Sequence, residues 1–325
     1  MPQLVSPVSR FKAWRGAVAS AITALLFVGG VHAAAPQIKT QAPGYYRMML
    51  GDFEVTALFD GIIELDAKEL LSNTTGVQVD KLLERSYEAA KVPTSVTAYL
   101  INTGDKLVLV DTGAADKFGP TLGRLQGNLK AAGYQPEQVD TLVVTHMHGD
   151  HVGGLVVDGK IAFPNATLMA AKEDQDFWLA ASALEKVPPD EQAFFKMAQD
   201  SVNPYVQAGK FKAIVGNAEI VPGIHAVATH GHTPGHTVYV VESQGQKLVL
   251  WGDLMHFAAV QFAQPQVTIA FDVDKKAAQA QRKKAYADAA KGRYLVGSAH
   301  LPFPGLGHLR AEGKGYAFVP VGYRP

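Results

Sequence analysis

Short apolar runs bounded by Gly, Pro, Asn or Asp recur along most of the chain. Most are rich in β-branched and aromatic residues, a pattern that predicts β-strands. Strands are expected at 52–59, 95–102, 106–111, 141–146, 225–230, 237–243, 247–253 and 294–300. Stretches between them have the composition of helices, and these are 121–133, 172–186, 190–201 and 275–291. The last stretch consists mainly of strong helix formers and is followed by a stop signal, Gly292.

The order of these elements predicts how they pack. Short turns at Gly104 and Gly245 join two pairs of strands into hairpins, and each hairpin runs into an aspartate, Asp111 or Asp253. Two β-rich halves, each followed by helices, predict an α/β fold with two sheets face to face and helices outside, an αβ/βα four-layer sandwich. Residues 34–325 are expected to form this single domain, with 36–50 as an N-terminal arm over its body.

The first 33 residues have the pattern of an export signal. Arg10, Lys12 and Arg15 precede an apolar stretch over 17–31, and small residues follow at 33–35. This pattern predicts a Sec-type signal peptide cleaved after residue 33, and a periplasmic or secreted protein. An uncleaved membrane anchor is the alternative, which the shortness of the apolar stretch disfavours.

Charge and composition narrow the range of partners. Cleavage would remove three basic residues and no acidic residue from totals of 30 each, which leaves a formal charge of about −3 at neutral pH. A mildly acidic surface argues against nucleic acid and, after cleavage, against membranes as partners. The chain has no cysteine, so disulfides and thiolate metal ligands are excluded and the fold must rely on its apolar core.

The run THMHGDH at 145–151 holds three of the 11 histidines of the chain. Alternation along a strand accounts for His146 and His148, but Asp150 and His151 break that period, so packing does not explain the run. It follows an apolar strand, where the functional loops of layered α/β folds begin. Imidazole and carboxylate groups at this spacing suit a metal ion such as Zn, Mn, Fe or Co.

More candidate ligands follow at the ends of later apolar runs. His232 lies in GHTPGH, Asp253 in LWGD and His300 in SAH. A shared edge would bring together seven ligands, namely His146, His148, Asp150, His151, His232, Asp253 and His300. A tetrahedral zinc ion takes four ligands, so seven indicate two divalent ions, with zinc expected and Mn, Fe or Co as alternatives.

These motifs resemble those of the metallo-β-lactamase fold superfamily: H-x-H-x-D-H at 146–151, the later GH, the isolated Asp253, the late His300 and LVDTG at 109–113. Longer stretches, including APGYYRMMLGDFEVTAL and AHLPFPGLGHLRAEGKGY, are similar to methyl parathion hydrolases and their lactonase relatives. The resemblance implies a homodimer. It also implies one ion held by His146, His148 and His232, a second held by Asp150, His151 and His300, and a bridge formed by Asp253.

Two further residues are expected to support the ligands. Asp111 would orient the ligand loop, as metal-binding imidazoles usually require, although an aspartate at a strand end is also a common turn residue. His236 shares a loop with His232 and is either a supporting residue or a structural histidine.

The expected chemistry is hydrolysis of a small molecule. Two neighbouring ions can share a hydroxide that attacks a carbonyl carbon or a phosphorus atom, with Asp150 and Asp253 as the carboxylates of the catalytic centre. The G-x-S-x-G motif of serine hydrolases is absent from the sequence. A non-catalytic metal-binding protein is the alternative of another class, but closed structural sites have four ligands and no open position.

Aromatic and bulky residues near the metal loops are expected to line the substrate pocket, although pockets and cores share this composition. The candidates are Phe118, Trp178, Phe194, His256, Ile269 and Phe271. The resemblance implies that the first three form a wall on which an aromatic substrate would stack. Organophosphate-hydrolysing relatives have a leucine in place of His256 and smaller residues in place of Ile269 and Phe271. The narrower pocket favours an aromatic lactone or aryl ester of the dihydrocoumarin type, with organophosphate hydrolysis as a secondary activity or, in the alternative interpretation, the main one.

Overall fold

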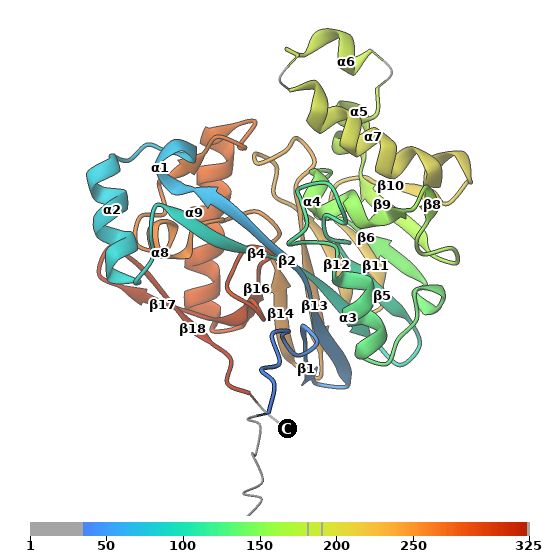
Figure 1. Ribbon diagram of the computed structural model, residues 1–325, viewed down its shortest axis with the longest axis horizontal. Coiled ribbons are helices and arrows are strands. Elements are labelled where there is room, and N and C mark those ends of the chain that lie inside the picture. The colour runs from blue at the N-terminus through green and yellow to red at the C-terminus, as the bar shows by residue number, and fades with distance from the viewer. Residues whose placement is uncertain (1–34, 181, 190, 324–325) are drawn as a thin grey trace, which may run out of the picture. The chain divides into compact units, whose positions relative to one another are not determined.

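The computed structural model describes residues 35–180, 182–189 and 191–323, and the described residues from Gln41 onward form one compact unit. The expected signal peptide at 1–33 lies outside the described residues. Two seven-stranded sheets form the centre of the compact unit (Figure 1). None of the helices in the described part of the chain has the length and the apolar character needed to cross a membrane.

The first sheet holds the strand that leads into the histidine-rich loop. Its strand order is β1 (Tyr45–Leu50), β2 (Phe53–Asp66), β4 (Lys91–Asn102), β5 (Leu107–Val110), β6 (Thr141–Val143), β9 (Thr167–Ala171) and β10 (Phe211–Ile214). In this sheet β1, β2, β4 and β5 pair antiparallel, whereas β5, β6, β9 and β10 run parallel. The loops that follow β5 and β6 therefore leave from the same edge.

The second sheet supplies the later candidate ligands. Its order is β11 (Ala218–Val221), β12 (Ile224–Ala228), β13 (Thr237–Ser243), β14 (Gln246–Leu250), β16 (Leu295–Gly297), β17 (Leu306–Glu312) and β18 (Gly315–Pro320). Strands β14 and β16 are parallel neighbours, so the segments that carry Asp253 and His300 emerge side by side.

Alternation along the strands divides the apolar side chains among three layers of core. In β5, Val108 and Val110 pack between the sheets against Tyr239 of β13, while Leu109 faces the helices α3 (Leu125–Ala131) and α7 (Gln192–Gln207). In the second sheet the outward-facing residues Val238, Val249 and Val296 pack against α9 (Lys275–Gly292). This arrangement confirms the predicted αβ/βα four-layer sandwich.

Shorter elements flank the layers and carry the loops around the site. They are α1 (Ala67–Leu70), β3 (Leu71–Ser72), α2 (Gly76–Arg85), α4 (Gly149–Val152), β7 (Val156–Val157), β8 (Lys160–Ile161), α5 (Lys172–Trp178), α6 (Ala183–Lys186), α8 (Ala258–Gln261) and β15 (Thr268–Ile269). In Figure 1, α5, α6 and α7 gather at the upper right, and α1, α2, α8 and α9 lie at the left.

Some elements differ from the sequence-based expectation. The expected arm at 36–50 contains β1, an edge strand whose Tyr46 and Leu50 point into the core while Tyr45, Arg47 and Met49 are exposed. Apolar residues on the exposed side hide this alternation in the sequence. The expectation of one helix at 172–186 is wrong: the structure has two helices there, α5, which ends at Trp178, and α6, which begins at Ala183.

Candidate metal centre

The histidine-rich run folds as a loop followed by a single helical turn. His146 lies just beyond β6, and Asp150 and His151 belong to α4. Gly149 starts this turn at a point where an added Cβ would lie 3.0 Å from Met197 Sδ and 3.1 Å from the ring of Phe118. Because glycine has no side chain, the loop packs directly against Met197 and Phe118.

Four ligand atoms form a first cluster. His148 Nδ1 lies 2.9 Å from His146 Nε2 and 3.1 Å from His232 Nε2. One oxygen of Asp253, Oδ2, lies 3.2 Å from His232 Nε2 and 3.6 Å from His146 Nε2. Segments far apart in the sequence thus place three imidazole nitrogens and one carboxylate oxygen around a common point.

A second cluster surrounds the other oxygen of Asp253. His151 Nε2 and His300 Nε2 lie 3.1 Å and 3.2 Å from Asp253 Oδ1. Each of these nitrogens also lies 3.5 Å from Asp150 Oδ2. The two oxygens of a single buried carboxylate therefore face two different ligand clusters.

The donor atoms fit two divalent ions. Ligands about 2.0–2.1 Å from zinc in a tetrahedron lie about 3.3 Å from each other, close to the separations in both clusters. His151 Nδ1 lies 2.9 Å from Asp111 Oδ2, and in a neutral ring that contact leaves a lone pair on Nε2 facing Asp253 Oδ1. Both of these buried atoms lack a hydrogen-bond partner among the described residues, which calls for a cation between them.

The ligand rings are held from outside, as metal-binding imidazoles generally are. Of the four rings whose Nε2 faces the clusters, His151 contacts Asp111, His232 Nδ1 lies 2.9 Å from Asp272 Oδ1, and His300 Nδ1 lies 2.9 Å from the carbonyl oxygen of Ser95. His146 Nδ1 lies 3.1 Å from Thr145 Oγ1. With Nδ1 as the donor to these oxygens, the Nε2 lone pairs point inward.

Electrostatics favour ions at this centre. Burial lowers the pKa of His146 well below its ordinary value, so that imidazole is neutral, as a ligand must be. Burial would raise the pKa of Asp253, but the surrounding imidazoles, led by His151 and His300, hold it well below its ordinary value. Burial by itself would lower the pKa of His151, but the neighbouring carboxylates outweigh it, and the pKa lies well above its ordinary value. This position thus prefers a positive charge.

The two predicted supporting residues lie against the ligands. Asp111 accepts a hydrogen bond of 2.7 Å from Thr145 N in addition to its contact with His151. His236 is buried, and its Nε2 accepts a hydrogen bond of 3.1 Å from Asp253 N. Burial lowers the pKa of His236 to about 3, which keeps this nitrogen free to accept.

Sequence reasoning missed several buried carboxylates behind the ligands. Asp272 contacts His232 and lies 3.6 Å from Nη2 of the fully buried Arg282. Asp174 accepts hydrogen bonds from Met147 N, in the histidine-rich loop, and from Thr233 Oγ1 and Gly235 N, in the loop that carries His232. Asp60 accepts from Ala114 N and Leu125 N and so fastens the loop that carries Phe118. Most aspartates in proteins are exposed, and the sequence has no pattern that distinguishes these three buried aspartates from the exposed ones.

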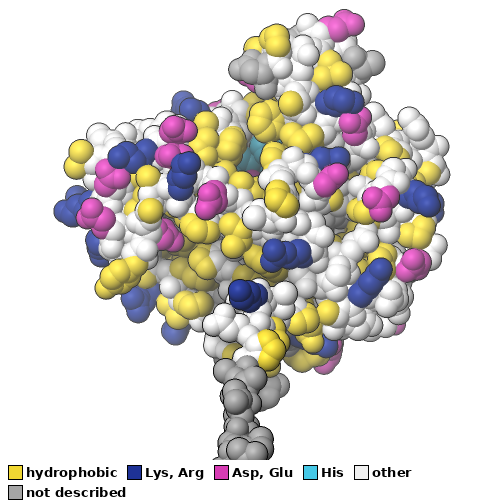
Figure 2. Space-filling view, in the orientation of Figure 1, with side chains coloured by type: hydrophobic (Ala, Val, Ile, Leu, Met, Phe, Trp, Pro, Cys, Tyr) yellow, Lys and Arg dark blue, Asp and Glu magenta, His cyan; other side chains and the backbone are white. Residues whose placement is uncertain are grey.

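A cavity of about 200 Å³ opens at the metal centre. It is lined by Ile63, Leu65, Phe118, His148, Gly149, Asp150, Phe194, Asp253, His256, Phe271 and His300. Four of the six predicted pocket residues are among these, whereas Ile63 and Leu65 were not expected. Figure 2 shows hydrophobic side chains around a recess in which histidine is visible.

The remaining two predicted pocket residues lie elsewhere. Trp178 lines an adjoining cavity of about 340 Å³, which shares His148, Phe194 and Phe271 with the first. Its ring stands edge-on to His148 at 5.3 Å between centroids. Ile269 is completely buried in a separate apolar cluster with Leu71 and Phe257, because β15 pairs with β3.

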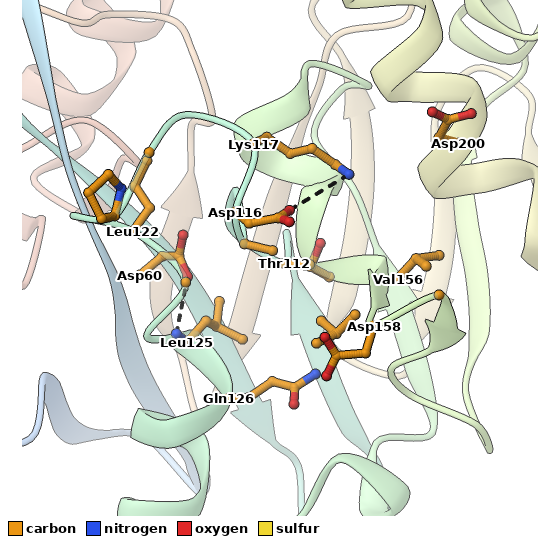
Figure 3. A pocket seen from close by; sticks show the side chains of 17 residues that line it. Asp60, Thr112, Asp116, Lys117, Leu122, Leu125, Gln126, Val156, Asp158 and Asp200 are labelled. Carbon is orange, nitrogen blue, oxygen red and sulfur yellow. Dashed lines mark hydrogen bonds and ion pairs between the residues drawn. The ribbon is translucent and has the colours of Figure 1, made fainter.

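A larger cavity, of about 740 Å³, lies apart from the seven ligands in the part of the chain that is described. Asp60, Thr112, Asp116, Lys117 and Asp158 are among the residues lining it (Figure 3). The Asp60 carboxylate that borders it hydrogen-bonds to the backbone at Leu125, and Lys117 pairs with Asp116. Of these polar groups, Asp60 thus holds the loop that carries Phe118.

Two sheets sandwiched between helices, with imidazoles and carboxylates in two clusters at the strand ends, define a metallohydrolase-like α/β protein with a candidate dinuclear centre. The family model of the metallo-β-lactamase superfamily matches residues 92–291, more than half of the chain. The chain belongs to this superfamily.

Known proteins resemble the chain to different extents. A solved structure described as hydrolase AbOPH in the beta lactamase superfamily is 38% identical, with a TM-score of 0.83, and the match covers 88% of this chain and 100% of that one. AidC, described as a dizinc quorum-quenching lactonase in complex with the product N-hexanoyl-L-homoserine, is 27% identical, with a TM-score of 0.80 and coverage of 87% and 99%.

Matches to curated proteins are shorter. An N-acyl homoserine lactonase from Bacillus sp is 28% identical over an alignment of 174 residues, and the match covers 48% of this chain and 61% of the relative. A second, from Agrobacterium fabrum, is 27% identical over an alignment of 150 residues, and the match covers 42% of this chain and 50% of the relative. The match to the first of these relatives thus spans about three-fifths of its length.

Proposed function

We propose that this protein is a metal-dependent hydrolase that uses two divalent ions, with zinc expected, to open lactones and aryl esters of the dihydrocoumarin type. The observation that carries the proposal is the division of the Asp253 carboxylate, with Oδ2 facing the first cluster and Oδ1 the second. A structural site for one zinc ion has four ligands and no need for such a bridge. Lactonase activity of the similar proteins supports the choice of substrate.

Each ligand set would have a defined task. His146, His148 and His232 would hold one ion, Asp150, His151 and His300 the other, and Asp253 both. When bound, two ions supply Lewis acidity and lower the pKa of water, so that a nucleophile is available near neutral pH. The chain itself orients the ligands through Asp111, Asp272 and His236.

The pocket residues would hold a flat substrate against this centre. Phe118, Phe194 and Phe271 surround the 200 Å³ cavity together with Ile63 and Leu65 and give it an apolar wall. An aromatic lactone ring can stack on these rings and place its carbonyl beside His148 and His300. His256 and Phe271 narrow the same space, which disfavours a phosphotriester with three substituents and makes organophosphate hydrolysis a secondary activity in this proposal.

A second candidate substrate class is an N-acyl homoserine lactone. The adjoining cavity of about 340 Å³, lined by Phe177, Trp178 and Val273, has room for an acyl chain next to a lactone ring in the first cavity. The product bound to AidC and the activity of the Bacillus relative favour this class.

A substrate panel separates these possibilities. Turnover of dihydrocoumarin, N-hexanoyl homoserine lactone, phenyl acetate and methyl parathion is measured before chelation, after chelation and after zinc is restored. We expect the highest kcat/KM for dihydrocoumarin and loss of all activity on chelation. Fastest turnover of the homoserine lactone supports the second class, and fastest turnover of methyl parathion contradicts the pocket argument. Activity that survives complete metal removal contradicts the proposal as a whole.

We also propose that the protein is exported by its N-terminal signal and acts as a homodimer. The export pattern at 1–33 supports the first point, and the resemblance to methyl parathion hydrolases supports the second. N-terminal sequencing of protein from the periplasmic fraction, and light scattering after size-exclusion chromatography, test the two points separately.

A further inference from the structure

We infer that Asp174 is a positioning residue for one of the two ion sites, the site of His146, His148 and His232. The inference rests on the dinuclear centre of the proposed function and is independent of the substrate. No part of the sequence pattern points to this residue, since it lies in the polar run KEDQD at 172–176.

Asp174 joins the two loops that carry these ligands. It is the third residue of α5 and only 1% of it is exposed. Its Oδ2 accepts a hydrogen bond of 3.1 Å from Met147 N, the backbone amide between His146 and His148. The same oxygen accepts a bond of 3.0 Å from Thr233 Oγ1, the residue after His232, and Oδ1 accepts a bond of 2.6 Å from Gly235 N.

The close approach of the second loop depends on a glycine. A Cβ added to Gly235 would lie 2.5 Å from Asp174 N and 2.8 Å from Asp174 Cβ. Because that contact is with backbone, any larger residue would push the loop away from α5. The loop thus reaches the carboxylate only with glycine at this position.

The same helix holds His148 from a second side. Trp178 at the end of α5 stands edge-on to the His148 ring, with 5.3 Å between centroids. The backbone beside His148 is held by Asp174 and its ring by Trp178, so α5 sets both the position and the tilt of this ligand.

The second ion site has different supports. His151 is held by Asp111 and His300 by the carbonyl oxygen of Ser95. Among the described residues, the hydrogen bonds accepted by the Asp174 side chain come only from Met147, Thr233 and Gly235. Loss of the carboxylate should therefore weaken one ion site and leave the other intact.

The test compares Asp174→Asn with Asp176→Asn. Asp176 lies on the same helix, with 60% of its side chain exposed, and pairs with Lys172 on the surface. Zinc is titrated into each metal-free protein against a chromophoric chelator, which gives two dissociation constants. Histidine-selective NMR identifies which imidazoles bind the weaker equivalent. Loss of an outer-shell partner typically costs about 10–100-fold in metal affinity.

We expect Asp174→Asn to weaken one equivalent by about 10–100-fold, assigned to His146, His148 and His232, while Asp176→Asn matches the unaltered protein. Unchanged constants, or equal weakening of both sites, would overturn the inference. A lower Tm of the metal-free protein without a change in either constant would also overturn it, because that is the signature of a purely structural role.

A milder pair of variants keeps the test decisive if Asp174→Asn does not fold. Thr233→Val removes one donor to the carboxylate, and Thr233→Ser restores it. We expect a smaller weakening of the same equivalent in the valine variant and recovery in the serine variant, and no difference between them would count against the inference. Fewer than two zinc equivalents in the unaltered protein would instead refute the proposed dinuclear centre.

Discussion

Replacement of Asp253 by asparagine tests the bridge between the two ligand clusters. The side chain is 2% exposed, its Oδ1 lies 3.1–3.2 Å from two imidazole nitrogens, and its Oδ2 lies 3.0–3.6 Å from four. Asparagine keeps the shape but removes the negative charge and turns an NH2 group toward one cluster. That cluster retains three of its four ligand atoms.

The size of the effect follows from this loss. Removal of an outer partner of a metal ligand costs about 10–100-fold in affinity, so loss of a direct anionic ligand should cost at least 100-fold for one ion. This corresponds to about 3 kcal/mol or more. Since groups that stabilise developing charge contribute about 10²–10³ in kcat, kcat/KM should fall by at least this factor.

Zinc content after dialysis and dihydrocoumarin hydrolysis are the two assays. Asp200→Asn is the control, because Asp200 is an exposed residue that pairs with Lys196 on the surface of α7. We expect about one zinc per chain in Asp253→Asn and about two in the control. An Asp253→Asn protein with two tightly held ions and unchanged kcat/KM would refute the bridging role.

Three other predictions follow from buried groups and the pocket. Arg282→Met leaves Asp272 without its cationic neighbour and removes the bonds to the carbonyl oxygens of Leu254 and Val267, so it should lower the free energy of unfolding by about 3–5 kcal/mol in urea titrations; a loss below 1 kcal/mol would contradict this role. Burial raises the pKa of Asp174 from its ordinary value to about 6. The stability that protonated Asp174 adds to the metal-free protein is therefore full below about pH 4 and is lost as pH rises through about 6. The unfolding free energy of the unaltered protein minus that of Asp174→Asn should therefore fall by up to about 3 kcal/mol between pH 4 and pH 7, and a constant difference would argue against the raised pKa. Ile63→Phe should fill part of the 200 Å³ cavity and lower kcat/KM for dihydrocoumarin at least tenfold with zinc content unchanged, whereas unchanged kinetics would show that substrate does not enter there.

The sequence revealed the layers of the fold because strands buried on both faces have a strong pattern. Hairpins such as 237–250 combine β-branched residues with a clear turn, and the structure has β13 and β14 at that place. The edge strand β1 and the hairpin of β17 and β18 were missed, because their exposed faces carry apolar residues or their charged residues resemble a loop.

The ligand positions were accessible from sequence because histidines are scarce and their spacing is unusual. Their supports were not. Asp174 and Asp176 are two residues apart in one polar run, yet the turn of the helix buries the first beneath the ligand loops and exposes the second. Ile269 was expected in the pocket and lies in an apolar cluster, because an apolar residue suits a cavity wall and a core equally well.

The most direct test of the dinuclear centre is a metal count tied to activity. Zinc bound per chain is measured by elemental analysis while ions are returned stepwise to the chelated protein, and dihydrocoumarin hydrolysis is followed in the same samples. We predict that full activity coincides with two equivalents and that crystals of this material show two anomalous peaks, one beside each oxygen of Asp253. Full activity with one equivalent or none would contradict the central claim.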